Sequence, residues 1–418
     1  MELTADQKVA AKQFSKFLLN QNQKVFVLEG YSGCGKTTLT KYLLSLVESN
    51  YEMLKYLIKD KTMFRPEVAL TATTHKAATE LSKQTGQEAT TIHSFLKLRV
   101  QTDYRAGKTK LVRDKNFKLV HSTILFVDEA SMVDQVLFDA IKDSTEHCKL
   151  VLIGDPKQLL HMDSDEAIAF SNPEVHAKLS SVVRQAAGNP IIQLATDFRK
   201  AIDDPSFTPD ISQYLGDTII NIDGDVFQSL VHDRFSPENY QPNKTKILCW
   251  TNRQVNDYNG YIRRMHTSID TPYPGERLIA NAPVVFGNKI LIGNEQSITV
   301  NSIDTKPENY LGVPVFSLYA IGIQEAIKIP ACGTTYNREL NKAKREKDWY
   351  KYFSLKDGIA DLRPPYASTI HKAQGSTVDE VFLDLNDISK CKSRDTLLRL
   401  LYVGCTRPTE RLYIYGDI

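Results

Sequence analysis

The stretch GYSGCGKTT, from Gly30 to Thr38, combines residue types at a spacing that suits phosphate binding. It fits G-x-x-x-x-G-K-[ST], in which glycines let backbone N–H groups approach phosphate oxygens. The lysine would place a charge at the β- and γ-phosphates, and the hydroxyl that follows it would bind Mg²⁺. The loop alone fits a small-molecule kinase, a switch or a motor. The predicted nucleotide-binding residues here are Gly30, Gly33, Gly35, Lys36, Thr37 and Thr38.

Two adjacent carboxylates, Asp128 and Glu129, end the apolar run ILFVDEAS. Asp128 could hold Mg²⁺ through its water shell, and Glu129 could polarise the water that attacks a γ-phosphate. A polar strand end is the structural alternative. Because a kinase of a small acceptor must exclude water, the second carboxylate favours hydrolysis.

Three further side chains could act on the same phosphate. Gln158, in LIGDPKQL, could sense the γ-phosphate, although Gly-Asp-Pro also makes an ordinary turn. Arg184 and Arg407 could each bring a planar guanidinium to a phosphoryl group that gains charge. Taken singly, either arginine is more often a surface residue.

Continuous apolar runs predict the strands that position these residues. In the first part of the chain they are KVFVLEG (24–30), EVALTAT (67–73), STILFVDE (122–129) and KLVLIGD (149–155). Helical patterns alternate with them, which is typical of a parallel sheet covered on both faces. We therefore predict an α/β domain over residues 1–93 and 121–165.

A second α/β domain is predicted over residues 166–270 and 366–418. Its apolar runs are KILCWTN (246–252), EVFLDL (380–385) and RLYIYGD (411–417). No second G-K-[ST] loop accompanies them, so the chain has two such domains and one nucleotide loop.

A basic insertion at 94–120 interrupts the first domain. Two alternating stretches flank Gly107, which predicts a β-hairpin. Eight lysines or arginines and two aspartates give it a net charge of +6, against +2 for the whole chain. It is either a solvated hairpin or an arm that binds phosphates.

A second insertion at 271–365 lies between the proline-rich joints TPYPGE and RPPY. Short alternating strands inside it predict a small β-barrel. A charged helical stretch at 337–353, NRELNKAKREKDWYKYF, follows the strands.

The composition of the 418 residues, 42% hydrophobic and 24% charged, fits ordinary globular cores. No apolar run is long enough for a membrane span, and no signal-peptide pattern opens the chain. None of the six cysteines forms C-x-x-C, so neither a zinc site nor a disulfide framework is indicated. A reducing, intracellular setting fits best.

Eight motifs follow one another in a fixed order along the chain. They are GYSGCGKT, TATTHKAA, TIHSFL, VDEAS, GDPKQL, VVRQ, STIHKAQGST and LYVGCTR. This series resembles the superfamily 1B helicases, in the RecD/Dda-like branch, over nearly the whole chain. The resemblance implies two RecA-like domains, with a strand-splitting hairpin in the first. It implies an SH3-like barrel and helical arm, inserted in the second, that brace the hairpin.

The resemblance also implies roles in ATP hydrolysis. Gln7 would read the adenine base, although Thr4-x-x-Gln7 is also a capping box that opens a helix. Gln374 and Gly375 would couple the second domain to ATP. Arg184 and Arg407 would be two arginine fingers, so that hydrolysis would depend on closure of the domains.

The DNA path is likewise implied by the motifs. Thr74, His75, His93 and Ser94 would line it in the first domain, and Asn252, Thr369 and His371 in the second. The hairpin would contribute Lys97, Arg99 and Tyr104. Tyr104 is a candidate wedge residue; Phe95 and Phe117 are others, more simply explained as core residues.

The chain departs from the family pattern at two places. Leu160-His161-Met162 stands where the family often has proline, and Pro408 follows Arg407 where a small residue is usual. These departures affect local loop and backbone shape.

The implied activity is an ATP- and Mg²⁺-dependent DNA helicase that moves 5′→3′; the polarity rests on the family alone. Expected partners are single-stranded and forked DNA, with a single-strand-binding protein or replisome components. We expect a monomer that needs no membrane, in the cytoplasm of a phage-infected host. The alternatives are a translocase that strips proteins without unwinding, a P-loop kinase, and action on RNA.

Overall fold

The computed structural model describes residues 3–58, 66–105, 107–160, 166–171, 173–181, 188–286 and 289–417. The chain forms two compact units. Unit 1 contains Met1–Arg99, Leu111–Asp210 and Leu398–Thr406; unit 2 contains Val100–Lys110, Ile211–Leu397 and Arg407–Ile418. Within the described ranges, no helix combines the length and the apolar character needed to cross a bilayer.

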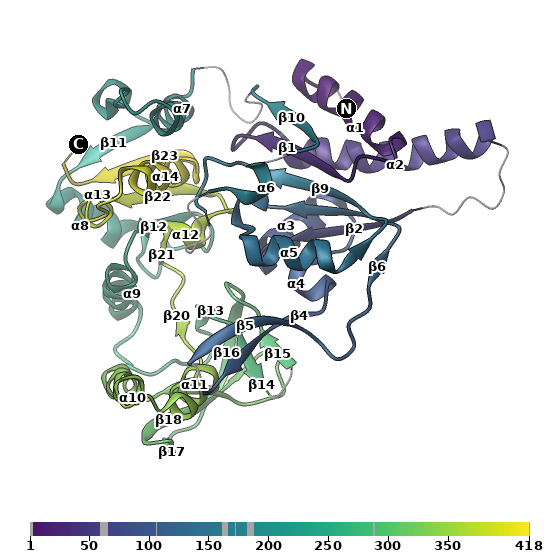
Figure 1. Ribbon diagram of the computed structural model, residues 1–418. Helices are drawn as coiled ribbons and strands as arrows, with labels where there is room; N and C mark the ends of the chain where they lie inside the picture. Colours follow the sequence, from purple (N-terminus) through teal and green to yellow (C-terminus); the bar gives the residue numbers. More distant parts are fainter. Residues whose placement is uncertain are drawn as a thin grey trace. The chain divides into compact units, whose positions relative to one another are not determined.

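Unit 1 is built on a six-stranded, wholly parallel sheet with the order β10-β1-β9-β7-β2-β3 (Figure 1). The strands are β1 (Val25–Gly30), β2 (Glu67–Ala72), β3 (Ala89–Thr91), β7 (Thr123–Asp128), β9 (Lys149–Gly154) and β10 (Val175–Leu179). The four predicted apolar runs are β1, β2, β7 and β9. The short strands β6 (Val120–His121) and β8 (Thr145–Glu146) form a separate pair.

Alternate residues of the central strands enter two different cores. Phe26 and Leu28 pack against α1 (Ala5–Leu19) and α2 (Lys36–Ile58), and Val27 packs on the opposite face against α5 (Gln135–Asp143). Burial of both faces is what a wholly parallel sheet requires. The remaining helices of this unit are α3 (His75–Thr85), α4 (Ile92–Phe95), α6 (Ile168–Ser171) and α7 (Pro190–Asp203).

The predicted end of the first domain at residue 165 is too early. Strand β10 pairs in parallel with β1, and Phe26 lies opposite Val175. The strand sits at the edge of the sheet, and Glu29 of β1 pairs with its His176 and Lys178 at 3.0 Å each. Residues up to Asp210 therefore belong to unit 1.

Unit 2 contains a five-stranded parallel sheet with the order β11-β23-β22-β12-β21. The strands are β11 (Ile219–Ile222), β12 (Thr245–Cys249), β21 (Ala367–Thr369), β22 (Val378–Asp384) and β23 (Pro408–Tyr415). Its helices are α8 (Gly224–Arg234), α9 (Asn252–His266), α12 (Ile370–Ala373) and α13 (Leu385–Ile388), and α14 (Arg394–Cys405) begins in this unit. The three predicted runs fall on β12, β22 and β23, so the expectation of two parallel-sheet α/β domains is confirmed. Most of α14, predicted in the second domain, clusters with unit 1.

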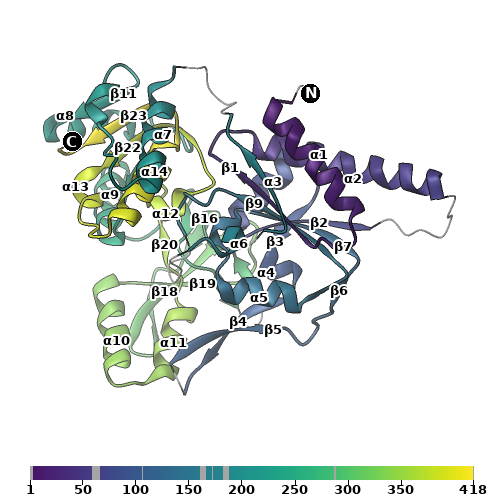
Figure 2. The same ribbon diagram turned by 45° about the horizontal axis from the view of Figure 1, so that its top comes forward.

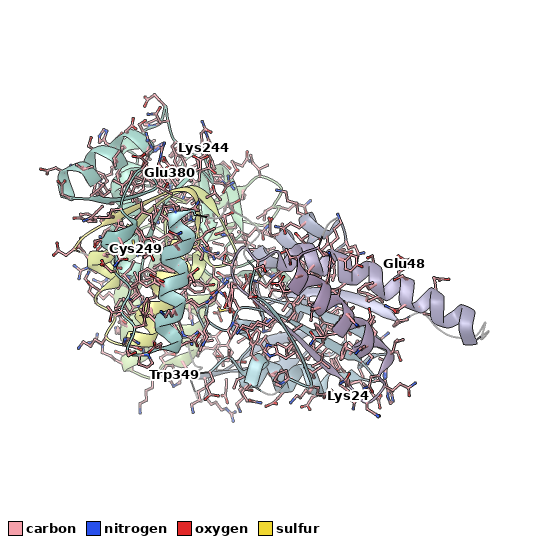
Figure 3. The ribbon with its side chains drawn as sticks, turned by 90° about the horizontal axis from the view of Figure 1, so that it is seen from above. Lys24, Glu48, Lys244, Cys249, Trp349 and Glu380 are labelled. Atoms are coloured by element: carbon pink, nitrogen blue, oxygen red, sulfur yellow. The ribbon has the colours of Figure 1, made fainter. Side chains whose placement is uncertain are left out.

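The amino-terminal end of β22 is anchored by Glu380, which is labelled in Figure 3. Its buried carboxylate accepts hydrogen bonds from Arg234 Nε of α8 at 2.9 Å and from Arg411 of β23 at 3.0 Å. Its backbone N–H donates to Lys244 O at 2.8 Å. A buried carboxylate needs such partners, and here they fasten one helix and two strand ends together.

The 271–365 insertion forms an antiparallel sheet and two helices. Its strands are β13 (Arg277–Ala280), β16 (Ser297–Ile303), β17 (Glu308–Tyr310), β18 (Val313–Ala320), β19 (Ile327–Pro330) and β20 (Leu362–Arg363), with a separate pair β14 (Val284–Phe286) and β15 (Lys289–Ile292). An SH3-like closure of these strands stays a prediction. The charged stretch is two helices, α10 (Gly333–Arg345) and α11 (Trp349–Gly358), separated at Lys347, whose φ is +56°.

The basic segment forms the predicted hairpin, β4 (Leu98–Asp103) and β5 (Lys108–Arg113), and Gly107 takes the positive φ of +64° in its turn. The tip packs on α11, as both ribbon views show (Figures 1 and 2). The Tyr104 ring lies 5.8 Å from Tyr350 and 5.9 Å from Phe353. A Cβ on Gly107 would overlap the Trp349 ring (labelled in Figure 3), so glycine is required there for space as well as conformation.

Candidate nucleotide and DNA sites

The phosphate loop connects β1 to α2 in unit 1. Gly33 and Gly35 have φ of +82° and +78°, a region that side chains disfavour. A Cβ on Gly30 would lie 2.6 Å from Cys34 Sγ, so this glycine is required by close packing. Lys36 Nζ donates to Gly30 O at 2.8 Å and to Tyr31 O at 3.0 Å, which keeps the ammonium inside the loop.

Gln7 joins helix α1 to the loop. The predicted capping box is confirmed, since Thr4 and Gln7 exchange both hydrogen bonds. Gln7 Nε2 also donates to Cys34 O at 3.2 Å, and the side chain is buried. Recognition of a base by Gln7 stays a prediction. Burial raises the pKa of the neighbouring Cys34 thiol, which fits a space-filling role better than a reactive one.

The two predicted carboxylates lie at the carboxyl edge of the same sheet, where β7 ends. Asp128 Oδ1 accepts the Glu129 N–H at 2.9 Å. Burial, and then the Glu129 charge, raise the pKa of Asp128 to about 6. Glu129 has φ +53°, a left-handed conformation that costs a non-glycine residue energy. Such strain clusters at functional sites, which supports a role for Glu129.

Two residues that the sequence interpretation missed connect this edge to the loop. Asp155 follows β9, is fully buried, and accepts a hydrogen bond from the Tyr402 hydroxyl at 2.6 Å. The Ser32 N–H of the loop donates to the same hydroxyl oxygen at 3.4 Å. Burial, and then the Asp155 charge, raise the pKa of Tyr402 well above its usual value, so the hydroxyl stays protonated. Both lie in quoted motifs, GDPKQL and LYVGCTR, from which only Gln158 and Arg407 were chosen.

Gln158 lies in the loop after Asp155, with its side chain buried. Its Oε1 atom has no hydrogen-bond partner among the described residues, although it is fully buried. Arg399 fixes the loop by donating to Pro156 O at 2.7 Å and Gln158 O at 2.9 Å. A buried amide oxygen without a partner is costly, so this atom fits a position that a bound ligand or its water would complete.

The two predicted arginine fingers are placed differently. Arg184 lies outside the described residues. Arg407 is buried in unit 2 and donates to Ser376 O at 3.1 Å and Ala373 O at 3.5 Å. These carbonyls flank Gln374 and Gly375, so the structure brings three predicted ATP-coupling residues together.

The predicted DNA residues of unit 1 follow two neighbouring strands. Ala72 of β2 lies opposite Thr91 of β3, so the residues beyond these strand ends share one edge. Thr74, His75 and Ser94 are exposed, and His93 is partly exposed. Thr74 caps α3 by accepting the Ala77 N–H at 3.2 Å, and Ser94 Oγ accepts the Thr91 hydroxyl at 2.9 Å.

Unit 2 repeats this arrangement. Cys249 of β12 lies opposite Thr369, the last residue of β21, and Asn252 and His371 follow these two strand ends. Asn252 Oδ1 accepts a hydrogen bond from Arg363 at 2.9 Å. Thr369 is buried and caps α12, and burial lowers the pKa of His371, which favours a neutral imidazole.

The predicted DNA residues of the hairpin differ in their exposure and in their contacts. Lys97 and Arg99 are exposed, and Arg99 lies 3.5 Å from Asp114. Tyr104 retains 47% exposure while it packs on the arm. Phe95 contacts the unit 1 core and Phe117 lies under the Arg113 guanidinium, so both keep the structural explanation. The wedge residue stays unassigned.

The predicted Mg²⁺ ligands are Thr37, at the start of α2, and Asp128. Among the described residues, no group of three or more His, Cys, Asp or Glu side chains could hold a metal. One hydroxyl and one carboxylate fit the way Mg²⁺ usually binds, through few protein ligands together with phosphates and waters. The raised pKa of Asp128 agrees, because a cation would offset the cost of its charge.

Comparisons with known proteins relate this chain to helicases. Residues 2–205 match the model of an AAA domain, and residues 364–415 that of a UvrD-like helicase C-terminal domain. The ATP-dependent DNA helicase dda of Enterobacteria phage T4 is 28% identical over 97% of both chains. The ATP-dependent RecD2 DNA helicase of Deinococcus radiodurans is 32% identical over 41% of this chain and 21% of its own.

Solved helicase structures share the fold across the whole chain. The Pif1 helicase from Bacteroides, in complex with ADP-AlF3 and ssDNA, has a TM-score of 0.53 and is 15% identical over 100% of this chain and 93% of its own. At that identity the likeness concerns the fold alone.

Proposed function

Because the chain belongs to the RecD/Dda-like branch of the superfamily 1B helicases, we propose that it uses ATP hydrolysis to move along single-stranded DNA and unwind duplex DNA. One observation carries this proposal. The Gly30–Thr38 loop, the Asp128–Glu129 pair and Gln158 all follow strands of one parallel sheet at its carboxyl edge. Ligands of open α/β sheets bind at this edge.

The proposed hydrolysis assigns one role to each group. The loop N–H groups and Lys36 hold the phosphates, and Thr37 and Asp128 would hold Mg²⁺, which would offset phosphate charge. Glu129 accepts the proton of the attacking water. Gln158 senses the γ-phosphate, and its buried amide oxygen, which has no partner among the described residues, can accept a hydrogen bond from the attacking water.

The remaining proposed roles concern the γ-phosphate and the base. Arg184 and Arg407 stabilise the charge that develops on the phosphoryl group, as planar guanidinium groups do. Gln7 recognises the adenine base. Gln374 and Gly375 respond to the nucleotide, and the hydrogen bonds of Arg407 to the carbonyls on either side of them support this role.

The proposed DNA contacts are mainly with the phosphate backbone. In each sheet these residues lie at or beyond the ends of two neighbouring strands: Thr74, His75, His93 and Ser94 in unit 1, and Asn252, Thr369 and His371 in unit 2. Hydroxyl, amide and imidazole groups suit phosphate contact without sequence preference. Binding would weaken as salt rises.

The hairpin is the proposed strand-separating element, and the movement we propose is 5′→3′. The charge of +6 between residues 94 and 120 supports contact with DNA at the junction. The packing of Tyr104 and Gly107 on the arm supports a hairpin that keeps its shape under load.

The first experiment measures ATP hydrolysis with and without single-stranded DNA. We expect strong stimulation by DNA, greater than by RNA, and its loss in Lys36→Ala, which should still bind DNA. ATP hydrolysis indifferent to nucleic acid would instead favour a P-loop enzyme acting on a small acceptor.

A further inference from the structure

A pocket in unit 2 lies where the α/β sheet meets the 271–365 insertion. From the sheet side it is lined by Lys246, Ser368 and Lys372; from the insertion side by Asn281, Glu295 and Arg363. Two of these side chains, Lys372 and Arg363, also form hydrogen bonds that connect the two parts of the unit.

Lys372 forms the most complete of these connections. Its ammonium donates to Asn281 O at 2.7 Å, to Asn281 Oδ1, and to the Glu295 carboxylate at 2.8 Å. Both charged side chains are largely shielded, with 24% exposure for Lys372 and 13% for Glu295. A lysine has three donors, so all three of these are engaged by the insertion.

Two arginines secure the ends of the same insertion. At its entry, Arg263 of α9 donates to both oxygens of Glu276, at 2.6 and 3.0 Å, and to the carbonyls of residues 269–271. At its exit, Arg363 is held by both Asp361 oxygens and donates to Asn252. The insertion is therefore fastened to the α/β part at both proline-rich joints and at Lys372.

The position of Lys372 in the chain makes its connection distinctive. It follows His371, a proposed DNA residue, and precedes Gln374, a proposed ATP-coupling residue, in the four-residue helix α12. Arg407 binds the carbonyls that follow it. A displacement of this segment would reach the insertion through the Lys372 ammonium.

The insertion carries that displacement on to the hairpin, because its helix α11 packs against the hairpin tip. The geometry points to Lys372 as a positioning residue. It ties the insertion and the hairpin tip to the segment from His371 to Gln374, so that they move together with that segment. This inference rests on the proposed helicase function. Its consequence is that Lys372 serves strand separation more than ATP hydrolysis or DNA binding.

The alternative is that Lys372 binds a DNA phosphate directly. The two roles separate experimentally, because a phosphate contact would change the affinity for single-stranded DNA. A transmission role would leave that affinity in place and reduce the base pairs opened per ATP.

The test compares Lys372→Met with Lys390→Met in the full chain. Lys390 also pairs with a carboxylate of unit 2, Asp387 at 3.1 Å, and neither residue belongs to the insertion. Three quantities are measured for each: affinity for single-stranded DNA, DNA-stimulated ATP hydrolysis, and forked duplex opened per ATP.

We expect Lys372→Met to keep its affinity for single-stranded DNA and its DNA-stimulated ATP hydrolysis near wild type. The amount of duplex opened per ATP should fall about tenfold, the size of effect that one lost charged contact can produce. Lys390→Met should keep all three. Glu295→Gln should cause a smaller loss of duplex opened per ATP. The double variant Lys372→Met with Glu295→Gln should lose no more than Lys372→Met alone, because both substitutions remove the same ion pair.

The inference would be overturned if Lys372→Met lost DNA affinity or ATP hydrolysis as much as it lost unwinding. It would also be overturned if unwinding by this variant were undiminished. If Lys372→Met melts at a much lower temperature than wild type, the same three measurements on Glu295→Gln take its place as the test. Failure of the wild-type protein to open duplex DNA would instead contradict the proposed function.

Discussion

Glu129 combines a left-handed backbone with a position directly after Asp128, whose pKa its charge helps to raise. Two neighbouring carboxylates at one strand end repel each other, so the arrangement costs stability. A bound cation and a water substrate would use both groups. The strain is therefore consistent with a site arranged for catalysis at the expense of local stability.

Glu129→Gln should bind ATP normally but hydrolyse it about 10²- to 10⁴-fold more slowly, the usual contribution of a general base. Single-turnover hydrolysis and nucleotide titration measure the two properties separately. Glu88→Gln, at an exposed glutamate, is the matched control and should behave as wild type. Near-normal turnover in Glu129→Gln would remove it from the role of base.

The cysteines should differ sharply in reactivity. Backbone and side-chain hydrogen bonds from Thr335 and Thr334 lower the pKa of the exposed Cys332, whereas burial raises the pKa of Cys34. Iodoacetamide near pH 8, followed by peptide mass spectrometry, should label Cys332 first and Cys34 only after unfolding. Equal labelling rates would show that the phosphate loop opens readily.

Residues within a local pattern could be predicted from the sequence, and long-range side-chain partners could not. Lys36 and Asp128 were identified because a loop and a strand end define them. Tyr402 was missed because its bond to Asp155 joins positions 247 residues apart, and no local spacing encodes that contact.

Among the elements, the β4–β5 hairpin is supported by helix α11 of the 271–365 insertion. An isolated two-stranded hairpin is marginal in water. Here Tyr104 and Gly107 pack on aromatic residues of α11. The exposed lysines beside them are thus presented on a supported element.

Reversal of three charges in the basic insertion at 94–120, Lys108→Glu, Lys110→Glu and Lys115→Glu, should impair unwinding more than DNA-stimulated ATP hydrolysis, because the positive charge at the junction is lost. The control reverses three exposed lysines of α1, Lys8, Lys12 and Lys16, with the same change in net charge. Gel-resolved unwinding and phosphate release measure both activities. Equal losses of the two in the hairpin variant would mean that the hairpin is only structural.

The edge strand β10 shows what apolar runs cannot predict. Ala177 and Leu179 are buried and Val175 is partly buried, and these three alternate with the exposed His176 and Lys178, because an edge strand need not be apolar on both faces. A search for continuous apolar runs passes over such a pattern. The same search found the central strands, where both faces are buried.

The whole chain contains two parallel sheets and one G-K-[ST] phosphate loop, which belongs to unit 1. Each sheet places polar residues beyond neighbouring strand ends, at Ala72 and Thr91 in one and at Cys249 and Thr369 in the other. The order of motifs predicted this duplication. It could not predict that Leu398–Thr406 clusters with unit 1, since membership depends on contacts such as Arg399 with Gln158.

The most direct test of the account follows strand separation of two duplexes, one with a 5′ single-stranded tail and one with a 3′ tail, in the presence of ATP and Mg²⁺. The account predicts ATP-dependent opening of the 5′-tailed duplex and little opening of the 3′-tailed one. Opening of the 3′-tailed duplex alone would reverse the proposed direction. No opening of either duplex, with DNA-stimulated ATP hydrolysis intact, would contradict the central claim that this protein unwinds DNA.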